Sequence, residues 1–144
     1  MEYKIKIIDE AKGEILFGHS EADKKTISKV DIMFDTIDDN VYSKGAGMLA
    51  RMTVEGEIKN DGSNTDCLMG LFNWAKSEES EEQYRTVEVE VWEHTTRLRV
   101  YNFEKMFVVD YEEIYSSKNS QDTTKFILKL TQQENNFDKV KTFK

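Results

Sequence analysis

The stretch YRTVEVEVWEHTTRLRVYNF, residues 84–103, contains two runs of alternating residues with a short polar link between them. Valines alternate with glutamates in the first run, and Leu98 and Val100 alternate with arginines in the second. A period of two is typical of a β-strand that buries one face. The link at Glu93-His94 is short enough for a tight hairpin, so we expect antiparallel pairing with glutamates opposite arginines.

The same period of two continues on both sides of this hairpin. We expect further strands at 2–8, 14–19, 26–35 and 48–58 before the hairpin, and at 105–116 and 123–133 after it. In the 48–58 strand Gly56 interrupts the apolar face, which predicts a bulge or a close approach of another chain segment.

A helical period occurs in one segment, which follows the cap candidates of residues 63–66. Leu68, Leu71, Phe72 and Ala75 are spaced to form the apolar face of a helix of about three turns. Gly70 inside this helix costs about 1 kcal/mol relative to alanine, so we expect another segment to pack closely against it.

The order of these elements contains no alternation of strands and helices, which excludes a parallel sheet built from βαβ units. The sequence predicts a mainly β fold: an antiparallel two-sheet β-barrel or sandwich with one short α-helix packed on the side. We expect a single domain over residues 1–133, followed by a polar C-terminal tail over residues 134–144 that shows no clear period.

Composition excludes several classes of function. The 144 residues carry a net charge of -8, which argues against nonspecific binding to nucleic acids or anionic membranes. No apolar run approaches the roughly 18 residues of a membrane helix, and charged residues interrupt the N-terminal segment where a signal peptide would be apolar. The chain has no proline, so its sheet edges lack a common device against strand pairing.

Candidate catalytic residues are few. His19 and Ser20 are adjacent in sequence, which does not favour a hydrogen-bonded nucleophile and base, and His94 belongs to the hairpin turn. Cys67, the single cysteine, allows no intramolecular disulfide, and we expect it to be a small buried residue. We therefore expect no enzymatic activity.

Candidate metal and phosphate sites are equally weak. The spacing of a calcium loop is missing at Asp35, Asp38, Asp39 and Asn40. Gly45–Gly47 precedes a strand, where a phosphate-binding loop would precede a helix. The chain has no HExxH motif. We therefore expect no metal and no other cofactor.

Several stretches of the chain together follow a pattern known from one protein family. Leu71–Ala75 has an LxxWA-like end of a short helix, and the valine-rich hairpin follows it. Tyr101–Tyr111 fits a strand of the type Y-x-F-x-x-x-(F/Y)-V-x-x-(Y/F) that carries VVDYEE. Residues 43–58, SKGAGMLARMTVEGEI, are similar to an extended Gly/Ser-rich loop and the strand after it. In these features most of the chain resembles the haemolysin co-regulated protein (Hcp) family of type VI secretion and the related phage tail-tube proteins.

The resemblance implies a structural subunit of the inner tube of a contractile phage-tail-like or type VI-like injection system. Six copies would close into a ring, and the rings would stack head to tail into a tube with a polar lumen. It implies that the partners are further copies of the chain together with sheath, baseplate or spike, and tape-measure proteins. Assembly is expected in the cytoplasm, with release or ejection outside the cell as part of a particle.

The resemblance also suggests roles for three groups of residues. The ring-stacking loop is expected at Tyr42, Ser43, Lys44, Gly45, Ala46, Gly47 and Met48. The strand face that lines the lumen is expected at Arg51, Thr53, Glu55 and Glu57. The outer helix is expected to carry Leu68, Leu71, Phe72, Trp74 and Ala75.

One other class of function stays open at this point. Aromatic residues make up 11% of the chain, and many of them fall in expected strands. A monomeric ligand- or carbohydrate-binding β-barrel could use such residues as a stacking platform, although aromatic residues are common in sheets of every function. The residues of that platform would be Phe34, Trp92, Tyr101, Phe103, Phe107, Tyr111 and Tyr115.

Overall fold

A computed structural model of the chain describes residues 1–9, 13–36, 48–77, 83–117, 124–133 and 141–143. Within these residues the chain forms eight strands and one α-helix. The elements are β1 (Glu2–Asp9), β2 (Gly13–Phe17), β3 (Ile27–Thr36), β4 (Met48–Glu57), α2 (Thr65–Ala75), β5 (Arg85–Glu93), β6 (Thr96–Ile114), β7 (Lys125–Gln132) and β8 (Lys141–Phe143).

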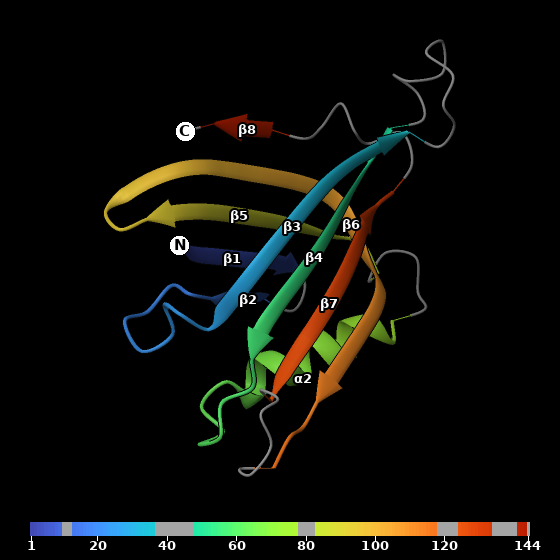
Figure 1. The fold of residues 1–144 in the computed structure, drawn as a ribbon. Helices are drawn as coiled ribbons and strands as arrows, with labels where there is room; N and C mark the ends of the chain where they lie inside the picture. The colour runs from blue at the N-terminus through green and yellow to red at the C-terminus, as the bar shows by residue number, and fades with distance from the viewer. Residues whose placement is uncertain (10–12, 37–47, 78–82, 118–123, 134–140, 144) are drawn as a thin grey trace.

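The strands pair in the order β2-β1-β5-β6-β7-β4-β3, and every pairing is antiparallel. In Figure 1, β3, β4, β7 and the lower half of β6 lie side by side, and β5, β1 and β2 cross behind them. The sheet therefore folds over on itself into two facing layers. This confirms the expected mainly β, antiparallel, two-sheet architecture with a short helix.

The two layers share one strand. We expected separate strands at residues 95–103 and 105–116, and this was wrong, because β6 runs without a break over 19 residues. Its first half pairs with β5, and its second half pairs with β7. The segment that reads as a turn in the sequence is a bend at Lys105, whose φ is +59°. Two residues of β6 stand there opposite one residue of β5, which is the geometry of a β-bulge.

The bend is held by the end of β7. The side-chain Nε2 of Gln132, which is almost fully buried, donates a hydrogen bond of 3.0 Å to the carbonyl oxygen of Glu104. The backbone N–H of Gln133 donates to the carbonyl oxygen of Lys105 at 2.7 Å. These bonds give partners to carbonyl groups that a bulge takes out of the regular ladder.

The β5–β6 hairpin turns one residue later than expected. Glu93 pairs with Thr96, so the two linking residues are His94 and Thr95, where we had expected Glu93 and His94. His94 has a φ of +54°, a positive value that the first linking residue of a two-residue hairpin turn adopts. The expected register of glutamates opposite arginines was wrong, because the shift between Val91 and Trp92 places Val100 opposite Glu90 and Arg99 opposite Val91. Arg97 still contacts Glu90 diagonally, at 3.4 Å.

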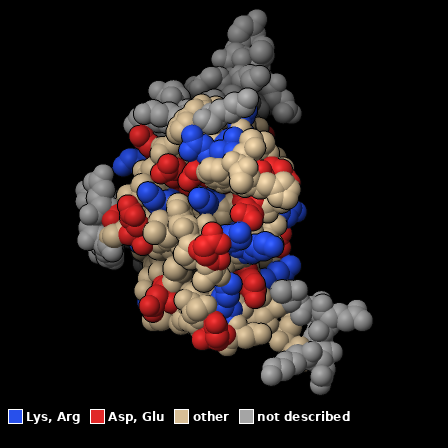
Figure 2. All heavy atoms as spheres, turned by 90° about the vertical axis from the view of Figure 1, so that its left-hand side faces the viewer, with Lys and Arg blue, Asp and Glu red and all other residues tan. Residues whose placement is uncertain are grey.

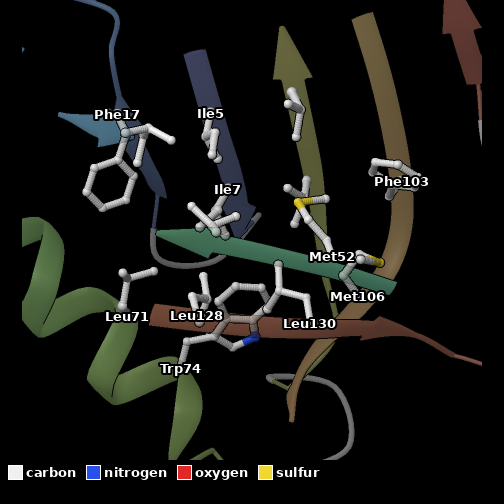
Figure 3. Close-up of a cluster of buried hydrophobic side chains, with 14 of the residues drawn as sticks. Ile5, Ile7, Phe17, Met52, Leu71, Trp74, Phe103, Met106, Leu128 and Leu130 are labelled. Carbon is white, nitrogen blue, oxygen red and sulfur yellow. The ribbon is translucent and has the colours of Figure 1, made fainter. Parts of the chain in front are cut away.

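The space between the layers is filled by apolar side chains from strands of both layers and from α2 (Figure 3). The alternating positions of β1, β5, β4 and β7 supply them, which confirms the faces expected from the period of two. The largest side chains that are almost fully buried are Trp74, Phe17, Phe103, Phe126, Ile5, Ile7, Leu71, Met106, Leu128 and Leu130.

Helix α2 is anchored by Trp74. Its indole Nε1 donates a hydrogen bond of 2.8 Å to the carbonyl oxygen of Gln83, just before β5. The guanidinium group of Arg85 lies over the indole ring, 5.2 Å from its centroid, and forms an ion pair of 3.3 Å with Asp9 at the end of β1. Arg85 is only 7% exposed, so this ion pair is more shielded from solvent and salt than a surface pair.

Two glycines explain how closely the elements pack. A Cβ atom added to Gly56 would lie 2.5 Å from the ring of the buried Phe126, which confirms the expected close approach in β4. The bulge at this place lies in the neighbouring strand β3, between Ile27 and Lys29. A Cβ atom added to Gly70 in α2 would lie 2.9 Å from Cδ1 of the partly buried Ile15 in β2.

Three polar side chains at alternate positions, two in β6 and one just after its end, are joined by hydrogen bonds. The hydroxyl groups of Tyr111 and Tyr115 both donate to the carboxylate of Glu113, at 2.6 and 2.5 Å. Burial, followed by the hydrogen bond to Glu113, raises the pKa of Tyr111 far above its ordinary value of 10.0. The phenol is therefore held in its protonated form, as its role of donor requires.

The expected C-terminal tail contributes to the sheet. Residues Lys141–Phe143 form β8, which pairs with Val100–Asn102 of β6, on the edge opposite β5. Residues 134–140 and 144 lie outside the described residues. The domain boundary at residue 133 stays a prediction.

The two glycines give a prediction about packing. Gly56→Ala should lower the free energy of unfolding by about 1–3 kcal/mol, because the ring of Phe126 is enclosed on all sides. Gly70→Ala should be close to neutral, since a gain of about 1 kcal/mol in helix propensity offsets a small shift of the flexible Ile15 side chain. Urea unfolding measures the free energy of unfolding of both variants. Equal losses of this free energy in Gly56→Ala and Gly70→Ala would contradict the difference in packing.

The raised pKa of Tyr111 gives a prediction about pH. Above pH 10.0 the unfolded chain loses the Tyr111 proton while the folded chain keeps it. The stability that depends on this group is therefore complete below that pH and is lost as the pH rises further. Tyr111→Phe should flatten the fall of the unfolding free energy above that pH, and Tyr115→Phe, at a well exposed position, should change it less. Unaltered slopes in Tyr111→Phe would contradict this account.

Candidate assembly surface

The residues expected to line a lumen lie on the face of β4 that points away from the core. Arg51, Thr53, Glu55 and Glu57 alternate with Ala50, Met52, Val54 and Gly56, all of which are buried. Because neighbouring strands are in register, this face continues over β3 on one side and over β7 on the other. The lumen-facing residues that we did not predict from the sequence are therefore those on the same face of β3 and β7.

Charges of both signs alternate across this outer face. Asp31, Thr53, Lys129 and Asp110 form one row over β3, β4, β7 and β6, as their register pairs show.

A second row runs through Lys29, Glu55, Ile127 and Glu112. Lys125 contacts Glu55 at 3.2 Å. The outer face therefore has no extended area of one sign, and the side of the molecule drawn in Figure 2 likewise shows acidic and basic side chains interspersed.

The layer that carries this face ends in two open edges. β3 is the last strand of the pairing order, and one of its edges has no partner strand among the described residues. The other open edge belongs to the second half of β6. β5 pairs with β6 only as far as Met106, so residues 107–114 have β7 on one side and no described strand on the other. Unpaired backbone N–H and C=O groups on such edges favour the addition of another strand.

The described α2 residues divide between the core and the surface. Leu68, Leu71 and Trp74 are buried, as expected for the inner face of the outer helix, and Ala75 is partly buried. Phe72 was expected to share that face, but its side chain points outward and is 54% exposed. The spacing of the helix explains this difference, because Leu68, Leu71 and Trp74 follow one another at three-residue steps and leave Phe72 to one side.

The expected ring-stacking loop cannot be placed. Tyr42, Ser43, Lys44, Gly45, Ala46 and Gly47 lie outside the described residues. The backbone of Met48 begins β4, where it pairs with Thr36 at the end of β3. The two ends of the connection are therefore neighbours in the sheet.

Among the described residues, no hydrogen bond joins the candidate nucleophiles to the candidate bases. His94 is almost fully exposed in the hairpin turn, with Nε2 3.5 Å from Glu93. His19 and Ser20 lie exposed in the turns after β2. Cys67 is partly buried, where we had expected full burial, and its Sγ lies 3.5 Å from the carbonyl oxygen of Leu16. Desolvation raises the pKa of the Cys67 thiol, which disfavours the thiolate needed for nucleophilic attack.

The aromatic residues do not gather on one exposed face. Phe103 is fully buried, with Tyr101 stacked on it at 5.7 Å between ring centroids. Lys4 covers the ring of Trp92 at 4.8 Å, and Phe107 meets Tyr84 edge to face. The described rings therefore offer no common stacking platform for a sugar.

Two further properties concern the part of the chain that the structure describes. No cluster of three or more His, Cys, Asp or Glu side chains in it could hold a metal ion. None of its helices has the length and apolar character needed to cross a membrane.

Comparison by sequence finds no matching protein-family model and no match among characterised proteins. Comparison by structure does find matches. Hcp1 from the E. coli EAEC 042 pathovar is similar with a TM-score of 0.63 at 7% identity, covering 99% of this chain and 98% of Hcp1. Hcp1 from Flavobacterium johnsoniae is similar with a TM-score of 0.55 at 13% identity, covering 99% and 98%.

A third match comes from a larger assembly. A chain in the PVC sheath-tube complex of an extracellular contractile injection system, in its extended state, is similar with a TM-score of 0.55. The identity is 14%, and the match covers 98% of this chain and 87% of that one. The protein therefore has the fold that Hcp proteins share with a component of a contractile injection system.

Proposed function

We propose that the protein is a structural subunit that closes into hexameric rings, which stack into the inner tube of a contractile phage-tail-like or type VI-like injection system. The observation that carries this proposal is the β3-β4-β7-β6 layer, which has a polar outer face and an open strand edge at each end. The fold shared with Hcp proteins and with a chain of a sheath-tube complex supports the same role.

The strand directions of the layer suit a closed ring. The four strands alternate in direction, because every pairing in the layer is antiparallel. A rotation about an axis along the strands brings β3 of one copy beside the second half of β6 of the next. These two strands also run in opposite directions, so the ladder can continue from copy to copy without a mismatch.

In such a ring the outer face of the layer lines the bore. Arg51, Thr53, Glu55 and Glu57 would then face the lumen together with the charged residues of β3 and β7. Interspersed charges keep water on the wall, so a passing molecule meets no apolar area to which it could adhere. This role requires no catalytic group and no cofactor.

The remaining parts of the proposal follow from the assembly. A tube of this kind needs a sheath around it and a baseplate or spike at its end, and matched chains occur in structures described as a sheath-tube complex and as a baseplate. A tape-measure protein would set the tube length. Assembly would take place in the cytoplasm, and the tube would leave the cell as part of a particle.

Electron microscopy of the purified protein over a range of concentrations tests the proposal. We expect six-fold rings at high concentration, and stacked tubes when sheath or baseplate proteins are added. Native mass spectrometry counts the copies in each ring. A protein that stays monomeric at high concentration and in the presence of these partners contradicts the proposal.

The connection between β3 and β4 gives a second test. Replacement of residues 37–47 by a tight two-residue turn should leave the fold and the rings intact, because Thr36 and Met48 are already paired at the ends of this connection. If this loop contacts the next ring, the shortened protein should form single rings but no tubes under the microscope. Tubes of unchanged length would show that the loop only connects two strands.

A further inference from the structure

A groove lies where α2 approaches the open edge of β6. It has a volume of about 260 Å³. Phe72 and Ala75 of α2 and Lys76 at its C-terminal end line it on one side, and residues 108–111 of β6 line it on the other. Most of its lining residues are apolar or aromatic, and Lys76 and Asp110 add one charge of each sign.

The groove faces the same side of the layer as the core. Val108 and Tyr111 pair with Leu130 and Leu128, whose side chains are buried, so both point to the core side of β6. Val109 is the extra residue of a β-bulge between them and is 52% exposed. The open backbone edge and the groove therefore lie together, one beside the other.

The opposite end of the layer presents a matching strip. Val30, Ile32 and Phe34 pair with Val54, Met52 and Ala50, so they point to the core side of β3. Because β3 is an edge strand, Val30 and Ile32 are only partly buried, and Phe34 is 40% exposed. The alternate residues Asp31 and Met33 point to the outer face.

From these positions we infer that the groove receives the β3 strand of a second copy of this chain. A strand added to the open edge of β6 continues the layer, so its core-side residues arrive on the groove side. Val30, Ile32 and Phe34 then pack against Phe72 and Val109, and all five side chains lose contact with water. The inference rests on the proposed ring and adds the residues that join its subunits.

Cysteine cross-linking tests this contact in a Cys67→Ser background. Val109→Cys is combined in turn with a cysteine at each position of β3 from 30 to 34. The two strands lie three strand spacings apart within one chain, roughly 14 Å, which is too far for an intramolecular disulfide. Any disulfide between the two sites must therefore join two copies. Denaturing electrophoresis without reductant then shows a ladder of linked subunits.

We expect ladders to alternate along β3. Cysteines at 30, 32 and 34 should give them at one or more positions, and cysteines at 31 and 33 should not, because they point to the other face. Rings that form by electron microscopy with no ladder, or with ladders at 31 and 33, overturn the inference but leave the proposed ring in place. A parent protein that forms no ring overturns both.

Two charged variants on one helix give an independent test. Phe72 lines the groove, whereas Met69, 58% exposed on the same helix, does not. Phe72→Glu should weaken self-association by roughly tenfold or more, because a carboxylate loses its hydration when apolar side chains cover it. Met69→Glu should leave association unchanged. Circular dichroism serves as the control that both variants are folded. If sedimentation finds the same self-association for Phe72→Glu and Met69→Glu, the inference is overturned.

Discussion

The length of β6 is the constraint on which the other features of the molecule depend. One strand of 19 residues belongs to both layers, so it joins them through its own backbone at the Lys105 bulge. The pairing between β5 and β6 stops at Met106, where β6 turns into the second layer. The second half of β6 is therefore left without β5 as a neighbour. The shared strand thus creates an open edge at residues 107–114. Since an open edge of this length invites strand addition, a fold built in this way favours self-assembly.

The sequence predicted most of the fold and less of the surface. Alternating valines and glutamates identified β5, and the apolar face of β7 was equally clear, because a half-buried strand must alternate. The bend in β6 was missed, since Asn102 to Lys105 has the composition of a turn, whereas contacts with distant residues such as Gln132 keep it in the sheet. The open edge was also missed as a specific site, because pairing between distant strands leaves no local signal.

The low identity to proteins of the same fold has a physical reason. The core requires apolar side chains at alternate positions and a tryptophan-anchored helix across one end, and many residues meet these needs. Only a few places are more demanding. Gly56 must lack a side chain because the Phe126 ring occupies that space, and Arg85 must reach both Trp74 and Asp9. A fold with so few fixed positions can keep its shape at 7% identity.

Backbone edges alone do not determine how two copies join. The N–H and C=O groups of β3 and β6 would pair equally well in registers that differ by two residues, because a step of two keeps each side chain on its own face. β3 stays paired with β4 in its own copy, so Val30, Ile32 and Phe34 arrive on the groove side in each of these registers. In the proposed ring, the fit of these apolar side chains into the groove beside α2 selects among the registers. The core-side residues of β3 would therefore supply the specificity that the backbone lacks.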